Sequence, residues 1–338
     1  MILITGGTGY IGSHTAVKLI EQGHEIVIFD NLYNSKIDAL DNIEKITGVR
    51  PKFYKADMLD KDALDKIFKE NQIHCVIHFA GLKAVGESVE EPLKYFHNNI
   101  TGTINLLMTM QKNNCKKIIF SSSATVYGTT QTMPLDETSP MGVTNPYGRT
   151  KLVIEDMLKD LSNSDKEWGI VLLRYFNPIG AHKSGLIGEN PNGIPNNLMP
   201  FICKVAGGEL PVLNVFGNDY DTIDGTGVRD YIHVEDLAEG HVLAYKKIVN
   251  KKGLYVYNLG TGRGYSVLQV IDAFEKANRI KINYKFAPRR AGDVAIVYAD
   301  TGRAERELGF KAKYNLEDMC KDSWNFAKKN LNKHSWNE

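Results

Sequence analysis

Residues 2–12, Ile-Leu-Ile-Thr-Gly-Gly-Thr-Gly-Tyr-Ile-Gly, decide the fold of this 338-residue chain. The apolar run predicts a strand that breaks into a loop containing Gly6, Gly9 and Gly12, and a helical pattern opens at Ile11. Backbone N–H groups at a helix N-terminus lack intrahelical partners, and the helix dipole favours negative charge. Glycine lets the backbone approach a phosphate without an intervening Cβ. The stretch therefore predicts a phosphate-binding loop after the first strand.

The next predicted strand indicates which phosphate compound binds. Residues 25–29 are apolar and end at Asp30, about 20 residues after the glycines, where the dinucleotide fingerprint places an acidic residue. A carboxylate there accepts hydrogen bonds from the adenosine ribose hydroxyls and repels a 2′-phosphate. We expect NAD rather than NADP. The spacing G-x-x-G-x-x-G resembles that of the extended short-chain dehydrogenase/reductase family.

Strand and helix patterns alternate through the first half, which predicts a Rossmann-type, doubly wound α/β fold with a parallel sheet. A loop-rich texture begins near residue 178, so we divide the chain into an NAD-binding domain, 1–178, and a smaller C-terminal α/β lobe, 179–338. A helix and a strand within 230–260 are expected to pack back on the first domain. Strands are predicted near 2–5, 25–29, 52–56, 74–79, 116–121, 169–175 and 254–258, and helices near 11–22, 34–47, 60–70, 92–113, 146–163 and 235–248.

Composition excludes several classes of protein. Lys plus Arg total 41 and Asp plus Glu total 40, a balance that argues against nucleic acid or a membrane as the main partner. No apolar run approaches the ~20 residues that span a bilayer, and the first strand begins without a signal peptide. The four cysteines form no C-x-x-C pair and the nine histidines show no ligand spacing. We expect a cytoplasmic protein without disulfides or a bound metal.

Tyr147 and Lys151 lie four residues apart and so share a helix face, with Pro146 suited to the first turn. An ordinary amphipathic helix can have the same spacing, but here it follows a dinucleotide loop and a fifth strand. A free tyrosine has a pKa near ~10. A nearby ammonium and a positive nicotinamide ring favour the phenolate, and a shift of roughly 3 units is worth about 4 kcal/mol. We therefore expect an acidified Tyr147 to act as general base and acid on a sugar hydroxyl.

Other candidate residues stand at predicted strand ends, where a doubly wound sheet binds its ligand. Ser123 ends the fifth strand, and its hydroxyl is expected to bind the reacting oxygen and share its proton with Tyr147. Asp57 follows the third strand and is placed to bind the adenine edge. Small residues after the fourth strand would let a cofactor pass; this segment is Phe79, Ala80 and Gly81.

Longer motifs carry a more specific resemblance. They are Thr5–His14 (TGGTGYIGSH), His78–Ser88 (HFAGLKAVGES), Ser121–Gly128 (SSSATVYG), Leu173–Gly180 (LRYFNPIG), Gly193–Pro200 (GIPNNLMP), Gly225–Val234 (GTGVRDYIHV), Tyr257–Gly262 (YNLGTG) and Ala287–Asp293 (APRRAGD). Over nearly its whole length the chain resembles the UDP-galactose 4-epimerase family, also called UDP-glucose 4-epimerases. The resemblance implies a homodimer of galactose metabolism, joined through the helices near 92–113 and 146–163.

The resemblance implies NAD-dependent, reversible epimerisation at C4 of UDP-hexoses through a transient 4-keto sugar. Tyr147 would remove the O4 proton with help from Ser123, and Lys151 would bind the nicotinamide ribose and keep Tyr147 acidic. UDP would be held firmly and the sugar loosely, so that the keto sugar presents both faces. The cofactor contacts implied, besides the glycines and Asp30, are Tyr10, Ile11, Asn31, Asp57, Met58, Phe79, Ala80, Gly81, Lys83, Asn98, Tyr147, Lys151 and Tyr175.

The same resemblance assigns the UDP-sugar site. Arg229 and Arg290 would bind the diphosphate, since a guanidinium matches phosphate geometry, and Asp293 would hold the uridine ribose. Val297 would wall the sugar pocket, where a small residue admits a 2-acetamido group and so predicts activity on UDP-GlcNAc and UDP-GalNAc; a one-residue slip would place Tyr298 there instead. The sugar and uracil region would be lined by Asn177, Asn196, Asn197, Leu198 and Phe216.

Two alternatives remain at this point. A UDP-sugar 4,6-dehydratase on the same fold needs an acid and a base after the strand-five hydroxyl, typically Asp-Glu, and this chain has Ala124-Thr125 there. A non-catalytic NAD-binding regulator would commonly lack the tyrosine or the lysine, and both are present. The product formed from UDP-galactose distinguishes the epimerase from these two alternatives.

Overall fold

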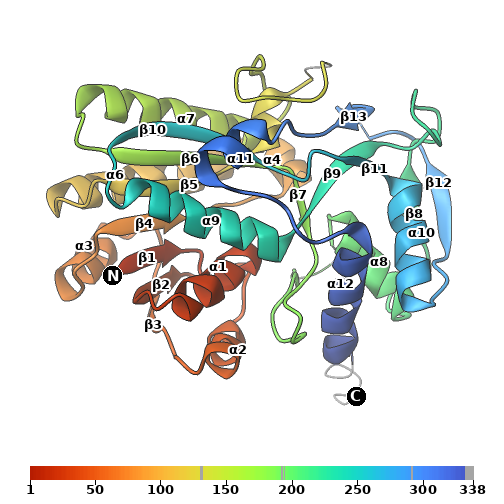
Figure 1. Ribbon diagram of the computed structural model, residues 1–338, viewed down its shortest axis with the longest axis horizontal. Coiled ribbons are helices and arrows are strands. Elements are labelled where there is room, and N and C mark those ends of the chain that lie inside the picture. The colour runs from red at the N-terminus through yellow and green to blue at the C-terminus, as the bar shows by residue number, and fades with distance from the viewer. Residues whose placement is uncertain (130–131, 192, 194, 291, 332–338) are drawn as a thin grey trace.

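The computed structural model describes residues 1–129, 132–191, 193, 195–290 and 292–331. Its centre is a seven-stranded parallel sheet with the strand order β10-β6-β5-β4-β1-β2-β3, which confirms the doubly wound α/β fold (Figure 1). The strands recognised in the sequence form this sheet, and all except the edge strand β3 contain buried residues. The strands of the sheet are β1 (Ile2–Thr5), β2 (Ile26–Asp30), β3 (Lys52–Lys55), β4 (Cys75–His78), β5 (Lys117–Ser123), β6 (Gly169–Tyr175) and β10 (Gly253–Leu259).

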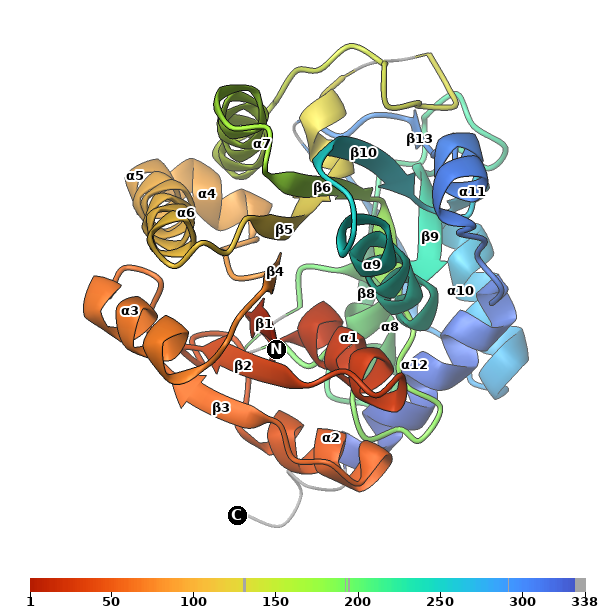
Figure 2. The same cartoon turned by 60° about the vertical axis from the view of Figure 1, so that its left-hand side comes forward.

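Helices cover both faces of this sheet, and Figure 2 shows the two layers. On one face α1, α2 and α9 pack on alternate strand residues, and on the other face α3, α6 and α7 pack on the residues between them. Burial on both sides explains why the central segments, such as β1 and β2, are almost continuously apolar. The helices are α1 (Tyr10–Glu21), α2 (Asp38–Thr47), α3 (Lys61–Glu70), α6 (Gly102–Lys112), α7 (Pro146–Ser164) and α9 (Val234–Ile248).

The start of α7 is set by its local sequence. The Asn145 side chain accepts a hydrogen bond from the Gly148 N–H at 2.8 Å, and Pro146 occupies the first helical position. A side-chain acceptor before the helix satisfies a donor that has no intrahelical partner, and proline there loses nothing. Tyr147 therefore lies in the first turn of α7, beside the end of β5.

Some boundaries differ from the sequence predictions. Residues 34–37 are not helical, and the helix predicted over 92–113 consists of α5 (Pro92–Tyr95), a π-helical turn (Phe96–Thr101) and α6. The wider turn contains Asn99, whose side chain bonds the backbone of Leu82 and the Thr150 hydroxyl. This tertiary contact has no periodic signal in the sequence. The short helix α4 (Val85–Glu90) was also not predicted.

The second half forms a smaller lobe with its own core between α8, α10, α12 and two small sheets. Figure 1 shows this lobe beside the carboxyl ends of the large sheet, while α9 and β10 return to the large sheet. No helix among the described residues is long and apolar enough to cross a membrane. The elements of the lobe and its borders are β7 (Asn177–Ile179), α8 (Leu198–Ala206), β8 (Leu213–Phe216), β9 (Val228–His233), β11 (Gly264–Ser266), α10 (Val267–Asn278), β12 (Tyr284–Ala287), β13 (Ile296–Val297), α11 (Gly302–Leu308) and α12 (Leu316–Leu331).

Candidate active site

The loop between β1 and α1 is packed so closely that only glycine fits. Gly6 has φ +71°, and a Cβ on it would lie 2.8 Å from the Ala80 backbone nitrogen. A Cβ on Gly12 would lie 2.3 Å from the Gly6 carbonyl oxygen, and one on Gly9 would lie 3.2 Å from the same atom. No side chain caps α1, and its first turn contains no acidic residue. The loop therefore presents a helix N-terminus that suits an anion.

Asp30 lies at the carboxyl end of β2, directly beside this loop. One of its oxygens accepts from the Thr8 N–H at 3.2 Å, and the other accepts from the Leu32 N–H at 2.9 Å and the Ser35 hydroxyl at 3.0 Å. These bonds fix a negative charge next to the glycines. The neighbouring Asn31 donates to Asp57 at 2.8 Å, so the two polar residues expected near the adenine lie together.

The segment after β4 passes close to the glycine loop, as expected for a residue group that borders a cofactor. The Ala80 N–H donates to the Thr5 hydroxyl at 3.3 Å. A Cβ on Gly81 would meet the Asn99 amide oxygen at 3.2 Å, and Asn98 donates to the same oxygen at 2.9 Å. Phe79 packs against the core on the face of the sheet that α1 covers, and Met58 is buried in the core on the other face of the sheet.

Several other residues predicted to contact a cofactor have side chains engaged within the protein. The Tyr10 hydroxyl donates to the Gly180 carbonyl at 2.7 Å, and the Tyr175 hydroxyl bonds His241. The Ile11 side chain packs against the large core. The Lys83 ammonium lies 3.2 Å from the Glu189 carboxylate. Of these residues, Lys83 is half exposed, so its ammonium can leave Glu189 for a ligand without disrupting the buried core.

Tyr147, Lys151 and Ser123 come together at the end of β5. The Lys151 ammonium donates to the Ser121 carbonyl at 2.6 Å and lies 5.9 Å from the centre of the Tyr147 ring. The Ser123 hydroxyl lies close enough to the Tyr147 phenol to lower its pKa, and it accepts from the Thr125 N–H at 3.2 Å. A phenol, a hydroxyl and an ammonium therefore share one buried edge of the sheet, an arrangement that can move a proton to or from a bound hydroxyl.

Burial dominates the electrostatics of these groups in the protein itself. Burial raises the pKa of Tyr147 to about 12, because desolvation penalises the phenolate, and the Ser123 hydrogen bond opposes this only in part. Burial likewise lowers the pKa of Lys151 to about 8, against the attraction of the Glu155 carboxylate. Among the protein groups themselves, desolvation therefore outweighs the neighbouring ammonium, and the predicted acidification of Tyr147, which also relies on the positive nicotinamide ring, stays a prediction.

Residues predicted to bind UDP converge in the smaller lobe. Arg290 donates to Asp293 at 3.0 Å, and Arg229 lies 3.8 Å from the same carboxylate. The Arg290 guanidinium lies 5.0 Å from the centre of the Phe216 ring. Val297 in β13 pairs with Arg229 in β9, which joins the expected sugar wall to the cationic group. Three separate segments of the sequence, at Phe216, at Arg229 and over 290–297, thus form one cluster.

The asparagines predicted to line the sugar are exposed. Asn177 begins β7, and Asn196 and Asn197 precede α8, whose first residue is the half-buried Leu198. Asn197 donates to Glu189 at 2.7 Å. Glu189 therefore bridges this segment to Lys83, a role that no spacing in the sequence signals.

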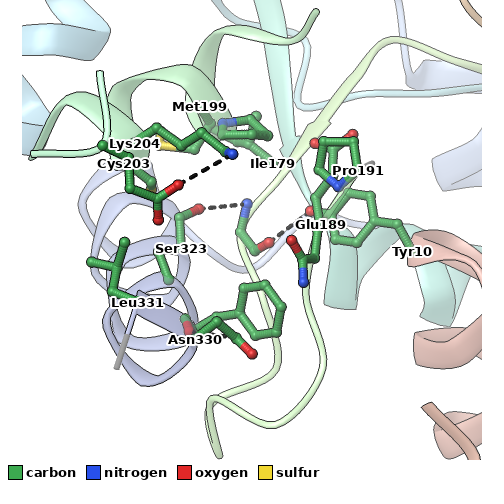
Figure 3. Close-up of a pocket in the computed structure, with 16 residues that line it drawn as sticks. Tyr10, Ile179, Glu189, Pro191, Met199, Cys203, Lys204, Ser323, Asn330 and Leu331 are labelled. Atoms are coloured by element: carbon green, nitrogen blue, oxygen red, sulfur yellow. Dashed lines mark hydrogen bonds and ion pairs between the residues drawn. The ribbon is translucent and has the colours of Figure 1, made fainter. Parts of the chain in front are cut away.

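A separate hollow lies between the segment following β7, α8 and α12 (Figure 3). Hydrogen bonds of Gly180 connect the segments of its wall. The Gly180 N–H donates to the Ser323 hydroxyl on α12 at 3.0 Å, and the Gly180 carbonyl accepts from the Tyr10 hydroxyl on α1. A Lys204–Glu209 ion pair of 3.2 Å lies at its side. Tyr10 is the one predicted site residue that lines this hollow, and the catalytic candidates lie outside it.

Comparison with known proteins places this geometry in a family. Residues 3–323 match the family model described as GDP-mannose 4,6 dehydratase. A UDP-glucose 4-epimerase of Bacillus subtilis is 60% identical over 331 residues, covering 98% of both chains. The chain belongs to the UDP-glucose 4-epimerase family. That family lies within the extended short-chain dehydrogenase/reductases, as the glycine spacing indicated.

Solved structures of the family match the fold closely. A UDP-glucose 4-epimerase from Bifidobacterium longum in complex with NAD+ and UDP has a TM-score of 0.95 and 55% identity, over 98% of this chain and 99% of that one. A UDP-Glc/GlcNAc 4-epimerase from Campylobacter jejuni has a TM-score of 0.84 and 37% identity, over 97% and 99%.

The dehydratase alternative is weakened by the residues beside Ser123. Ala124 and Thr125 begin the short helical turn that follows β5, so no carboxylate stands where the elimination needs its proton carrier. Among the described residues, no three His, Cys, Asp or Glu side chains lie close enough to hold a metal ion. The four cysteines are buried and unpaired.

Proposed function

We propose that the protein interconverts UDP-galactose and UDP-glucose by inverting C4, with NAD as its bound cofactor. The observation that supports this best is the meeting of Tyr147, Ser123 and Lys151 at the carboxyl edge of the sheet. This group lies on the sheet that also carries the glycine loop. The sheet edge and the arginine cluster of the smaller lobe are the two regions a UDP-hexose would span.

The residues present fit NAD. The glycine loop is a cradle that any Cβ would fill, and Asp30 fixes a negative charge where a 2′-phosphate would have to lie. When bound, NAD supplies an acceptor and donor of the C4 hydride and a positive charge on its oxidised ring. We assign residues 1–178, together with α9 and β10, to this cofactor and the remainder of 179–338 to the UDP-sugar.

Tyr147 takes the proton from the sugar O4 and returns it after inversion. The Ser123 hydroxyl, which lies beside the phenol, orients O4 and passes the proton. Lys151 holds the cofactor ribose and adds positive charge near the phenol. Because burial raises the pKa of Tyr147 to about 12, this charge and that of the cofactor together must make the phenolate accessible.

Inversion requires the 4-keto sugar to present both faces while the nucleotide stays bound. Arg229 and Arg290 supply bidentate donors to the diphosphate, and Asp293 supplies acceptors to the ribose. The sugar side, by contrast, is lined by Val297 and neutral amides, which hold it loosely. A firm grip on UDP and a weak grip on the hexose suit this chemistry.

We extend the proposal to UDP-GlcNAc and UDP-GalNAc. The Val297 side chain packs against the same small core cluster as Ala124, the neighbour of Ser123, whereas Tyr298 lies near Gly264 in β11. Successive side chains point to opposite faces of a strand, so Val297 is the residue on the catalytic side. The Campylobacter jejuni relative is a UDP-Glc/GlcNAc 4-epimerase. Turnover of UDP-GlcNAc that Val297→Tyr abolishes, with UDP-galactose turnover retained, supports the extension, and absence of turnover in the unmodified protein refutes it.

We also propose a homodimer through α5, α6 and α7. Apolar side chains on α5 and α6 are exposed, Leu93 by 80% and Met108 by 59%, and so is Val89 on the preceding α4, by 62%. Contiguous exposed apolar residues mark association surfaces. Leu93→Glu with Met108→Glu should give a monomer by light scattering, while Val49→Glu, at an apolar residue exposed by 52% elsewhere, should not. A monomeric unmodified protein refutes the dimer.

One incubation tests the main proposal. UDP-galactose is mixed with purified protein and NAD, and the nucleotide sugars are separated by chromatography. UDP-glucose as product supports the epimerase. A 4-keto-6-deoxy sugar supports the dehydratase, and unchanged UDP-galactose supports the regulator. Tyr147→Phe should lower kcat at least 100-fold, a factor within the range that general acid–base catalysis contributes.

A further inference from the structure

Helix α7 has a third polar side chain, Glu155, on the face that bears Tyr147 and Lys151. Tyr147, Lys151 and Glu155 follow one another at intervals of four residues, so they lie in a row. The Glu155 carboxylate accepts from the Ser122 hydroxyl at 2.6 Å, and the Lys151 ammonium donates to the Ser121 carbonyl at 2.6 Å. Two successive turns of α7 thus hold two consecutive residues of β5, immediately before Ser123.

Glu155 is fully buried, and a second buried charge neutralises it. The Arg174 guanidinium on β6 donates to both carboxylate oxygens, at 2.9 and 2.7 Å, and the two side chains are 2% and 0% exposed. Arg174 also donates to the Tyr127 hydroxyl at 3.0 Å, which donates to Asn258 on β10 at 2.6 Å. A buried charge is tolerated only when it is paired and hydrogen-bonded, and this network satisfies both conditions.

We propose that Glu155 is a positioning residue: through Ser122 it fixes the end of β5 so that the Ser123 hydroxyl stays beside Tyr147, and its charge faces the Lys151 ammonium. The proposal rests on the 4-epimerase function above. Its physical basis is that productive proton transfer needs hydrogen-bond geometry held within a few tenths of an ångström. A strand end bonded to the helix that bears Tyr147 provides that constraint.

The charge of Glu155 acts on Lys151 among a small set of neighbours. The titratable groups around the ammonium are Tyr147 and Glu155 on α7 and His78 on β4, whose pKa burial and Lys151 lower to about 3. His78 is therefore neutral at physiological pH. Tyr175 on β6 lies beyond Tyr147. Glu155 is the one anion acting on Lys151 among the described groups, and removing it lowers the pKa of Lys151 further below about 8.

Three variants separate positioning from stability. Ser122→Ala deletes the Ser122–Glu155 bond and leaves the Glu155–Arg174 pair intact. Glu155→Gln keeps an acceptor for Ser122 but removes the charge. Tyr127→Phe is the matched control, because it deletes hydroxyl bonds in the same buried network without touching the end of β5. For each variant, kcat, KM for UDP-galactose, the pH profile of kcat and the thermal unfolding midpoint are measured.

We expect Ser122→Ala to lower kcat about tenfold with KM changed less than twofold, since the loss is confined to the transition state. Glu155→Gln should lower, by about one unit, the pH at which the rise of kcat becomes shallower because Lys151 loses its charge. Glu155→Asp should recover part of kcat. Tyr127→Phe should lower the unfolding midpoint and leave kcat within twofold. If Glu155→Gln does not fold, Ser122→Ala decides.

Two results overturn the inference. The first is that Ser122→Ala keeps kcat within twofold of the unmodified protein. The second is that kcat of all three variants falls in proportion to their unfolding midpoints, because the network would then contribute to stability alone. The unmodified protein is assayed first on the same UDP-galactose. Its failure to form UDP-glucose would refute the proposed function, and it would do so before any variant is compared.

Discussion

Replacing Lys151 with methionine tests the electrostatics of the site directly. The change keeps the length of the side chain and removes its charge. Charges 5.9 Å apart, the distance from the ammonium to the Tyr147 ring centre, attract by about 3 kcal/mol at an effective dielectric constant of about 20. That energy equals about two pKa units of Tyr147, so the phenolate population and kcat should both fall about 100-fold.

The pH dependence gives the second part of this prediction. With a pKa of about 8, Lys151 is about nine-tenths charged at pH 7 and loses its proton above pH 8. In Lys151→Met the phenol pKa is higher, so kcat should rise about tenfold per pH unit between pH 6.5 and 9. In the unmodified protein the rise should be shallower above pH 8, because Lys151 loses charge as Tyr147 ionises.

The assay is conversion of UDP-galactose at saturating substrate and NAD, with products separated by chromatography. Lys166→Met, just beyond the end of α7, is the control and should keep kcat within twofold, because among the described residues its ammonium contacts only the last turn of that helix. Lys151→Met activity within fivefold of the unmodified protein, or a flat pH profile in the variant, would refute the electrostatic role.

Three further predictions follow from other contacts. Arg174→Met leaves Glu155 buried without its partner and should lower the free energy of unfolding by about 3–5 kcal/mol in urea titrations; a loss under 1 kcal/mol would contradict it. Asp30→Ala should lower the ratio of the NADPH to the NADH dissociation constant at least tenfold in fluorescence titrations, because the carboxylate that repels the 2′-phosphate is removed. An unchanged ratio of the two dissociation constants would argue against this role. Arg290→Ala should raise KM for UDP-galactose and the inhibition constant of UDP by the same factor, about tenfold, with kcat retained; a fall in kcat alone would place Arg290 elsewhere in the mechanism.

Much of the large domain follows from local sequence. The strand, the glycines and Asp30 are contiguous or regularly spaced, and each element's type depends on its own apolar periodicity. The Tyr147 and Lys151 pair is likewise local, because a four-residue interval puts both on one helix face wherever the helix lies. These features needed no knowledge of the second lobe.

The tertiary structure alone decided how these residues are charged and what holds them. Burial raises the pKa of Tyr147, an effect that its spacing to Lys151 does not reveal. The Glu155–Arg174 pair joins residues 19 apart in sequence on two different elements, and the Arg229–Asp293 contact joins residues 64 apart. Desolvation and ion pairing depend on which surfaces the folded chain brings together, and a linear pattern does not record that.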